Sequence, residues 1–215
     1  MSAQLLVLAK TPVPGRVKTR LCPPCTPEQA AEIAAAALAD TLTTVTATPG
    51  VRRRLVVEGD HPAPPGWGRT AQRGTTLGQR LAHGYADTRI AGVASLLIGM
   101  DTPQVSAGLL AAAVERLDDD AADAVLGLAE DGGWWALGLR DPAHGQAIRD
   151  VPMSTPDTGA RTLAVLRARG LRVAQLPALR DVDTWADAQA VAALCTADSR
   201  FALAVATVLS PVGAP

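Results

Sequence analysis

Short apolar runs of strand length alternate with longer segments of helical periodicity, and this alternation constrains the fold of the chain more than any other feature. The apolar runs cover residues 4–9, 51–57, 95–98, 124–128, 134–139 and 171–176. The helical patterns cover residues 27–45, 77–88, 106–117, 158–169, 184–194 and 199–209. Because parallel strands need long crossover connections, the alternation predicts an α/β fold with a mostly parallel central sheet. We expect a single domain over residues 1–215, since 48% of the 215 residues are apolar, enough for one sizeable core.

Local signals predict where several elements begin and end. Thr26-Pro27-Glu28-Gln29 indicates a helix start, with the threonine as N-cap, the proline at the first helical position and the glutamine closing a capping box. Ser106 is expected to cap a later helix, and Gly170 to end another. Turn residues 130–133 favour an antiparallel pair of strands within the otherwise parallel sheet. The Pro- and Gly-rich segment 58–69 is predicted to be a surface loop.

Charge, hydropathy and cysteine usage exclude several classes of protein. A formal net charge of -1 gives no broad positive field, so we expect neither nucleic acid nor a membrane surface as a partner. No apolar stretch reaches the roughly 20 residues that cross a bilayer, and no secretory leader pattern is present, so a cytoplasmic protein is expected. Cys22-Pro23-Pro24-Cys25 has the spacing of a redox dithiol or half a zinc site, but its prolines favour a loop and the other Cys and His residues lack ligand spacing. Exposed apolar helix faces are compatible with a homodimer, although the sequence does not fix the oligomeric state.

A cationic segment, residues 10–21, follows the first predicted strand. Its charged side chains surround Gly15 and are Lys10, Arg16, Lys18 and Arg20. Cationic groups and flexible backbone N–H groups together suit the wrapping of a polyphosphate. The chain holds two lysines beside eighteen arginines, and both lysines lie here, which indicates a need for compact point charges. A solvated basic loop is the alternative. The segment is not a Walker A loop, because Val17 separates the glycine from the lysine, and the chain has no GxGxxG motif.

Acidic residues follow other predicted strands, at the edge where parallel α/β sheets bind ligands. They are Asp101, Asp131, Asp181 and Asp183. Carboxylate oxygens suit Mg²⁺, so Asp101 with Asp181 and Asp183 predicts a metal site that bridges phosphates. Asp131, next to two glycines, is suited to accept a hydrogen bond from a substrate hydroxyl. Structural interpretations also stand: a turn at Asp101, a tight hairpin at 130–133, and a helix cap by Asp183 or Thr184.

Five of these segments, taken in order, carry a resemblance to a known family. They are Pro14-Gly15-Arg16-Val17-Lys18-Thr19-Arg20-Leu21, Ile98-Gly99-Met100-Asp101-Thr102-Pro103, Asp131-Gly132-Gly133-Trp134, Met153-Ser154-Thr155 and Asp181-Val182-Asp183-Thr184. Together they resemble the uncharacterised bacterial glycosyltransferase-like family of the nucleotide-diphospho-sugar transferase (GT-A) superfamily, over residues 4 to about 190. That family is similar in turn to the 2-phospholactate and molybdenum cofactor guanylyltransferases, which share a basic loop after strand one and an aspartate after a central strand.

The resemblance implies a three-layer α/β/α, Rossmann-like GT-A fold with a mostly parallel central sheet. It implies that the loop around Lys18 binds nucleotide phosphates and that Asp101 binds Mg²⁺ or Mn²⁺. It also implies that Asp181 and Asp183 line the metal and acceptor side of the site.

The chain departs from the family pattern at three places. Thr75-Thr76-Leu77-Gly78 stands where an acidic Asp-Leu-Gly is commoner, Thr102 replaces a small or thiol residue, and Met153 replaces a tryptophan. These departures bear on acceptor specificity more than on metal or nucleotide binding. Gln79 and Arg80 are still expected to close over the nucleotide from the adjoining helix.

Three functions remain open from the sequence. The first is sugar transfer from a nucleotide-diphospho-sugar to a small acceptor, with Lys18, Asp101 and Asp131 as catalytic residues and metal and lysine stabilising the leaving diphosphate. The second is nucleotidyl transfer, in which pyrophosphate leaves an NTP from the same clamp. The third is a nucleotide-binding module without turnover, which needs fewer carboxylates. We expect the first, with the acceptor, the base and the sugar left unspecified.

Overall fold

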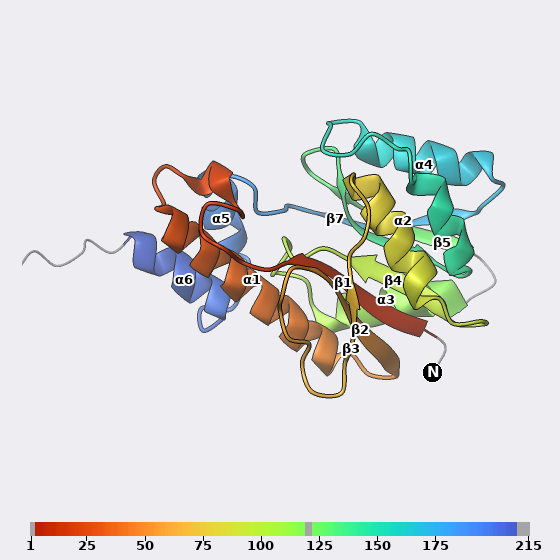
Figure 1. Ribbon diagram of the computed structural model, residues 1–215, viewed down its shortest axis with the longest axis horizontal. Coiled ribbons are helices and arrows are strands. Elements are labelled where there is room, and N and C mark those ends of the chain that lie inside the picture. Colours follow the sequence, from red (N-terminus) through yellow and green to blue (C-terminus); the bar gives the residue numbers. More distant parts are fainter. Residues whose placement is uncertain (1–2, 119–121, 210–215) are drawn as a thin grey trace, which may run out of the picture.

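The computed structural model describes residues 3–118 and 122–209, and its centre is a mostly parallel sheet of seven strands (Figure 1). The strands are β1 (Ala3–Lys10), β2 (Val51–Glu58), β3 (Gly68–Ala71), β4 (Ala94–Ile98), β5 (Ala124–Ala129), β6 (Trp134–Leu139) and β7 (Val173–Leu179). They lie in the order β3-β2-β1-β4-β6-β5-β7. Only β6 runs antiparallel to its neighbours in this part of the chain, pairing with β4 and β5. The predicted parallel sheet and its antiparallel excursion are therefore confirmed.

Helices cover both faces of the sheet and make three layers. The helices are α1 (Pro27–Ala47), α2 (Leu77–Thr88), α3 (Ala107–Asp118), α4 (Thr158–Ala168), α5 (Trp185–Ala192) and α6 (Arg200–Leu209), with the 3-10 segments η1 (Thr19–Leu21) and η2 (Pro142–Ile148). Alternate residues of β1 point to opposite faces. Leu5 and Val7 pack with α1 and α3, whereas Leu6 packs with α2, η2 and α4. No helix within the described residues is long and apolar enough to span a membrane.

Helix α1 is buried on two sides, which explains its many small apolar residues. Ala34 and Leu38 face the sheet, and Ile33 and Ala37 face a separate core formed with α5 and α6. Phe201 of α6 fills that second core and is fully buried. Figure 1 shows α5 and α6 against α1, on the side of α1 away from α2 and α4.

The predicted helix ends form as expected. Thr26 and Gln29 make a reciprocal capping box at the start of α1. The Ser106 hydroxyl accepts a hydrogen bond from the Leu109 backbone N–H at 3.2 Å, and Gly170 follows α4 with a φ of 78°. Side chains that satisfy helix-end N–H groups thus lie where their spacing predicts.

Two predictions about strands were wrong in detail. The predicted surface loop 58–69 ends in strand β3, which has no apolar run because it lies partly exposed at the edge of the sheet. The Arg54 guanidinium lies beside Gly68 and donates to the Thr70 hydroxyl at 3.1 Å. The last strand, predicted at 171–176, is β7 and extends through Pro177. Proline is tolerated because β7 is an edge strand, and the Pro177 carbonyl accepts a hydrogen bond from Trp135 Nε1 at 3.0 Å.

Replacement of Phe201 tests how much α6 contributes to stability. Phe201→Ala is expected to lower the free energy of unfolding by about 3–5 kcal/mol, because it leaves a cavity in the core between α1 and α6. Leu203→Ala, on the same helix but 55% exposed, should change it by less than about 0.5 kcal/mol. Urea denaturation of both variants measures the difference. Equal losses would mean that the buried contact of α6 is not what stabilises the second core.

Candidate active site

The carboxyl ends of β1, β4, β5 and β7 open at one edge of the sheet, because these strands all run in the same direction. Lys10 ends β1, and the loops after the other three strands carry Asp101, Asp131 and Asp181. The chain also changes direction across the sheet between β1 and β4, the position where open α/β sheets form a ligand crevice. The topology therefore gathers charged groups from distant parts of the sequence.

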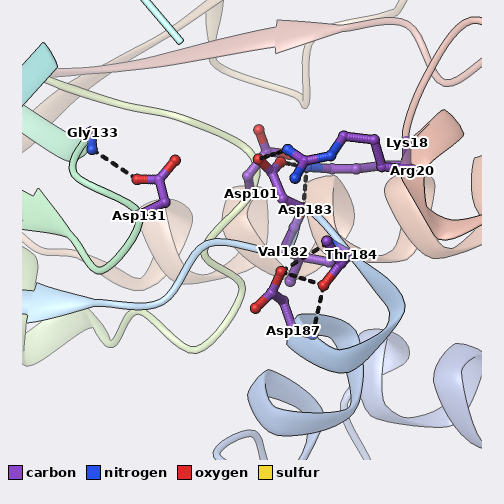
Figure 2. A network of polar contacts seen from close by, with 9 residues as sticks. All are labelled: Lys18, Arg20, Asp101, Asp131, Gly133, Val182, Asp183, Thr184 and Asp187. Carbon is purple, nitrogen blue, oxygen red and sulfur yellow. Dashed lines mark hydrogen bonds and ion pairs between the residues drawn. The ribbon is translucent and has the colours of Figure 1, made fainter. Parts of the chain in front are cut away.

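Lys18 lies at the centre of this edge (Figure 2). Its ammonium nitrogen is 2.7 Å from Asp101 Oδ1 and 3.4 Å from Asp183 Oδ1, and it donates a hydrogen bond to the Val182 carbonyl. The side chain is only 10% exposed. Its backbone has the uncommon left-handed conformation, with a φ of 48°, immediately before η1. One ammonium group thus joins the loops after β1, β4 and β7.

Two carboxylates keep Lys18 charged in spite of its burial. Burial disfavours the ammonium form, but attraction and hydrogen bonds to Asp101 and then Asp183 outweigh it, so the pKa of Lys18 is raised above its usual value. Arg20 adds a second cation, with Nη1 3.0 Å from Asp183 Oδ2. The site therefore carries a fixed positive charge at neutral pH.

Backbone contacts hold the two acidic segments together. The Val182 N–H donates to the Asp101 carbonyl at 2.9 Å, and the Val182 side chain is buried. Thr184 caps α5 and forms a capping box with Asp187. Of the two residues predicted as possible caps, Thr184 takes the role and Asp183 does not. The Asp183 carboxylate faces Lys18 and Arg20 instead.

Three carboxylates approach one another closely enough to share a cation. One oxygen each from Asp131, Asp181 and Asp183 lie within 4.8 Å of one another. Burial, then repulsion from Asp131 and Asp183, raises the pKa of Asp181 to about 6. An all-carboxylate donor set fits a hard divalent ion such as Mg²⁺ or Mn²⁺. The predicted set held Asp101 in place of Asp131, whereas the structure pairs Asp101 with Lys18.

The loop that carries Asp131 is a tight turn, as its structural interpretation predicts. The Gly133 N–H donates to Asp131 Oδ1 at 2.7 Å, and the Gly133 carbonyl accepts from the Ala129 N–H. Gly132 has a φ of 92°, and a Cβ there would lie 1.9 Å from the Pro156 carbonyl oxygen. The turn therefore needs glycine, and it holds Asp131 at the edge of the sheet.

Two adjoining cavities of opposite charge occupy this edge. The larger, of about 740 Å³, is the acidic cavity, and its charged residues are Arg20, Asp101, Glu130, Asp131, Arg180, Asp181, Asp183 and Asp187. The smaller, of about 280 Å³, is the basic cavity, and its charged residues are Lys10, Arg16, Lys18, Arg20, Asp101 and Asp183. Arg20, Asp101 and Asp183 line both. Lys18 and its partners therefore form the boundary between them.

Three of the predicted nucleotide-contact residues do not line either cavity. Gly15 forms a turn with a φ of 72°. Gln79 accepts a hydrogen bond from the Thr75 backbone N–H at 3.0 Å, and Arg80 Nη1 lies 2.5 Å from Glu58 Oε2. The remaining predicted residues, Lys10, Arg16, Lys18 and Arg20, line the basic cavity.

Several residues of the acidic cavity have no ligand-binding role assigned from the sequence. Arg180 and Glu130 form an ion pair at 2.7 Å across the ends of β7 and β5, and Trp134 and Ser154 also line the cavity. The first pair had a signal, because both residues follow predicted strands. Ser154 belongs to the Met153-Ser154-Thr155 segment of the family resemblance, but no local pattern predicts its place in the cavity, which depends on how the 152–158 segment packs.

Comparison with solved structures identifies proteins that share this fold. A Desulfovibrio desulfuricans G20 protein described as a "putative nucleotide-diphospho-sugar transferase" is 26% identical, with a TM-score of 0.83 and 94% of each chain covered. A CMP:2-keto-3-deoxy-manno-octonic acid synthetase complexed with CTP is 14% identical, with a TM-score of 0.58 over 90% of this chain and 98% of that one. Rv0371c of Mycobacterium tuberculosis H37Rv, in complex with manganese, is 18% identical, with a TM-score of 0.56 over 89% and 98%. The last two likenesses concern the fold alone.

A family model covers the central part of the chain. No curated protein matches the sequence. The three-layer, Rossmann-like fold of nucleotide-diphospho-sugar transferases is confirmed, while kinship with the guanylyltransferases remains a prediction. The family described as "Uncharacterized protein conserved in bacteria (DUF2064)" matches residues 30–155, more than half of the chain, a range that includes Asp101 and Asp131. The chain belongs to this family.

Proposed function

We propose that the chain is a metal-dependent transferase that moves a sugar from a nucleotide-diphospho-sugar to a small acceptor. The observation that carries this proposal is the pair of adjoining cavities, one basic and one acidic, with Lys18 at their boundary. In such a donor the diphosphate and the reacting sugar carbon are adjacent, so an anion site must lie beside an acceptor site. The likeness to the Desulfovibrio desulfuricans protein supports the same class of reaction.

The basic cavity is proposed to bind the donor's phosphates. Lys10, Arg16 and Arg20 supply cationic groups, and the volume of about 280 Å³ has room for a diphosphate. Lys18 is already held by Asp101 and Asp183, so its charge does not have to reorganise as negative charge develops on the leaving group. The lysine then lowers the energy of the departing diphosphate.

Asp131, Asp181 and Asp183 are the residues proposed to hold a divalent cation. Their oxygens lie within 4.8 Å of one another, and their donor chemistry suits Mg²⁺ or Mn²⁺. A bound divalent cation would supply further neutralisation of phosphate charge. Asp183 contacts Lys18 and also belongs to the three-carboxylate cluster, so it fixes the position of the proposed cation site relative to the lysine.

The proposed transfer breaks the bond between the sugar's anomeric carbon and the diphosphate oxygen and forms a bond from that carbon to an acceptor oxygen. The electron pair leaves with the nucleoside diphosphate, and the acceptor proton passes to a carboxylate or to water. Asp131 is exposed to the acidic cavity and oriented by Gly133, which suits it to accept a hydrogen bond from the acceptor hydroxyl.

Nucleotidyl transfer is the second candidate, favoured by the fold shared with the CTP-bound synthetase. The two reactions differ in their leaving group. Incubation with nucleotide-diphospho-sugars and Mn²⁺ should release nucleoside diphosphate, which chromatography detects. Release of pyrophosphate from an NTP, with no diphosphate from any sugar donor, would replace the first proposal by the second.

Removal of the Lys18 charge tests the phosphate assignment. Lys18→Gln is expected to raise the Kd for a nucleoside diphosphate about tenfold or more, since a charge-assisted contact contributes about 1.5–3 kcal/mol and 1.4 kcal/mol is tenfold. Arg52→Gln removes one positive charge from an exposed position of β2 outside both cavities and should change the Kd by less than about twofold. Titration calorimetry measures both. Wild-type affinity in a folded Lys18→Gln protein would contradict the assignment.

Asp181→Asn tests the proposed cation site, because it should raise the Tm of the metal-free protein and remove the further rise in Tm that Mn²⁺ gives. The pKa of Asp181 is raised from 3.8 to about 6 in the folded protein, so protonation of this carboxyl group favours the folded state. This stabilisation is complete below pH 3.8 and is lost as the pH rises through about 6. The variant without metal should therefore melt higher than wild type at pH 7.5, by a margin that shrinks toward pH 5. It should also lose the Mn²⁺-induced rise in Tm that wild type gives.

The matched control for this variant is Asp198→Asn, an exposed aspartate between α5 and α6. It should change neither the metal-free Tm nor the Mn²⁺ response. A full Mn²⁺ response in Asp181→Asn would show that this aspartate does not bind the cation. An unchanged metal-free Tm at pH 7.5 would show that its carboxylate is not destabilised by its neighbours.

A further inference from the structure

We propose that the acidic cavity binds an acceptor that carries hydroxyl groups and one apolar face but no phosphate, and that Ser154 orients this acceptor. The inference rests on the proposed transferase function and specifies its acceptor class. It follows from the charge of the cavity, the composition of one wall, and the backbone conformation of Ser154.

The charge of the acidic cavity opposes an anionic acceptor. Its carboxylates are Asp101, Glu130, Asp131, Asp181, Asp183 and Asp187. Its two cationic residues already have partners, since Arg180 lies 2.7 Å from Glu130 and Arg20 lies 3.0 Å from Asp183. With a divalent cation on Asp131, Asp181 and Asp183 the lining would stay net negative, because its six carboxylates outnumber its two arginines and the two charges of the cation, so a phosphate group on the acceptor is disfavoured. Carboxylates instead accept hydrogen bonds from hydroxyl groups.

One wall of the acidic cavity is apolar. Its side chains come from β1, α2, β4, β6 and the 152–158 segment, and they are Leu8, Leu77, Leu81, Leu97, Trp134 and Met153. Trp134 Nε1 donates to the Thr162 hydroxyl at 3.2 Å, which fixes the plane of the indole. Leu77 is 42% exposed although it begins α2 beside the cavity. Apolar surface in the lining of a cavity is typical of a ligand site, and here it belongs to the same cavity as the carboxylates.

Ser154 lines this cavity and has a strained backbone conformation. Among residues 3–118 and 122–209, the non-glycine residues with positive φ are Lys18, at 48°, and Ser154, at 58°. Lys18 lines the basic cavity, and Ser154 lines the acidic one. Serine in this conformation costs free energy relative to glycine, and such costs persist mainly where the surrounding structure and function require them.

Hydrogen bonds on both sides impose this conformation on Ser154. The Thr158 hydroxyl donates to the Pro152 carbonyl at 3.0 Å and accepts from the Thr155 backbone N–H at 3.1 Å. The Gly159 N–H donates to the Gly132 carbonyl at 2.8 Å, which docks the segment on the turn that carries Asp131. Ser154 therefore has a fixed position relative to the carboxylates, as a residue that orients an acceptor must have.

The charge argument is tested with a matched pair of probes in the absence of nucleotide. Octyl β-glucoside, kept below its micelle concentration, and the same glucoside phosphorylated at its 6-hydroxyl differ in charge but share one apolar face. Saturation-transfer NMR and titration calorimetry should show the neutral probe binding at least about tenfold more tightly. Equal or tighter binding of the phosphorylated probe, or no binding of either, would overturn the proposal. Donor binding is measured separately, so a protein that binds the glucoside but no nucleotide would count against the transferase function alone.

Two variants of Ser154 separate its hydroxyl from its backbone. Ser154→Gly relieves the strained φ, and Ser154→Ala keeps it, while both remove the hydroxyl. The glycine variant should melt at or above wild type and the alanine variant should not gain, yet both should weaken glucoside binding about three- to tenfold, the effect of one lost hydrogen bond. Affinity for a nucleoside diphosphate should stay unchanged in both. Wild-type glucoside affinity in either variant would show that Ser154 has only a structural role.

Discussion

The arrangement of the whole site depends on one partly buried ammonium group. Lys18 bridges Asp101, Asp183 and the Val182 carbonyl, which come from loops after different strands. Removing a charge from water is costly, and a buried pair contributes little net stability compared with a well-packed apolar contact. What the lysine does supply is geometry, because its ammonium reaches Asp101, Asp183 and the Val182 carbonyl together only when the three loops take one relative position. The left-handed backbone at Lys18 is part of the same constraint.

Opposite charges divide the edge of the sheet into regions with different chemistry. On the basic side, the lysines and arginines lie at the end of β1 and on the loop after it, and the carboxylates that line this cavity are Asp101 and Asp183. On the acidic side, burial and then repulsion from Asp131 and Asp183 raise the pKa of Asp181 to about 6, so a bound cation would stabilise its ionised form. Local instability of this kind is a common feature of binding sites, which sacrifice some stability for function.

Much of the fold, and part of the site, is readable from the sequence because local patterns encode it. Apolar runs identify most strands, but β3 has no such run, and β7 extends past a proline. The meeting of Lys18 with Asp101 follows from the rule that strand ends beside a switch point share a crevice. The grouping of Asp131 with Asp181 was not predicted, because it requires β5 to pair with β7, and strand order is not written in any local segment. The conformation of Ser154 is likewise a product of tertiary packing.

The short stretch between β7 and α5 is anchored in two independent cores. At one end β7 is part of the sheet, and in the middle Val182 is packed with α1, α5 and α6. Asp181 and Asp183 flank Val182, so both carboxylates lie on a segment that is held at β7 by the sheet and at Val182 by the second core. The spacing of the Asp181 and Asp183 carboxylates therefore depends on how closely α5 and α6 pack against α1. Substitutions at the interface between α1 and the α5–α6 pair therefore change the positions of the carboxylates without contacting any ligand. Directed evolution of the site should vary the residues behind α1 as well as those that line the two cavities.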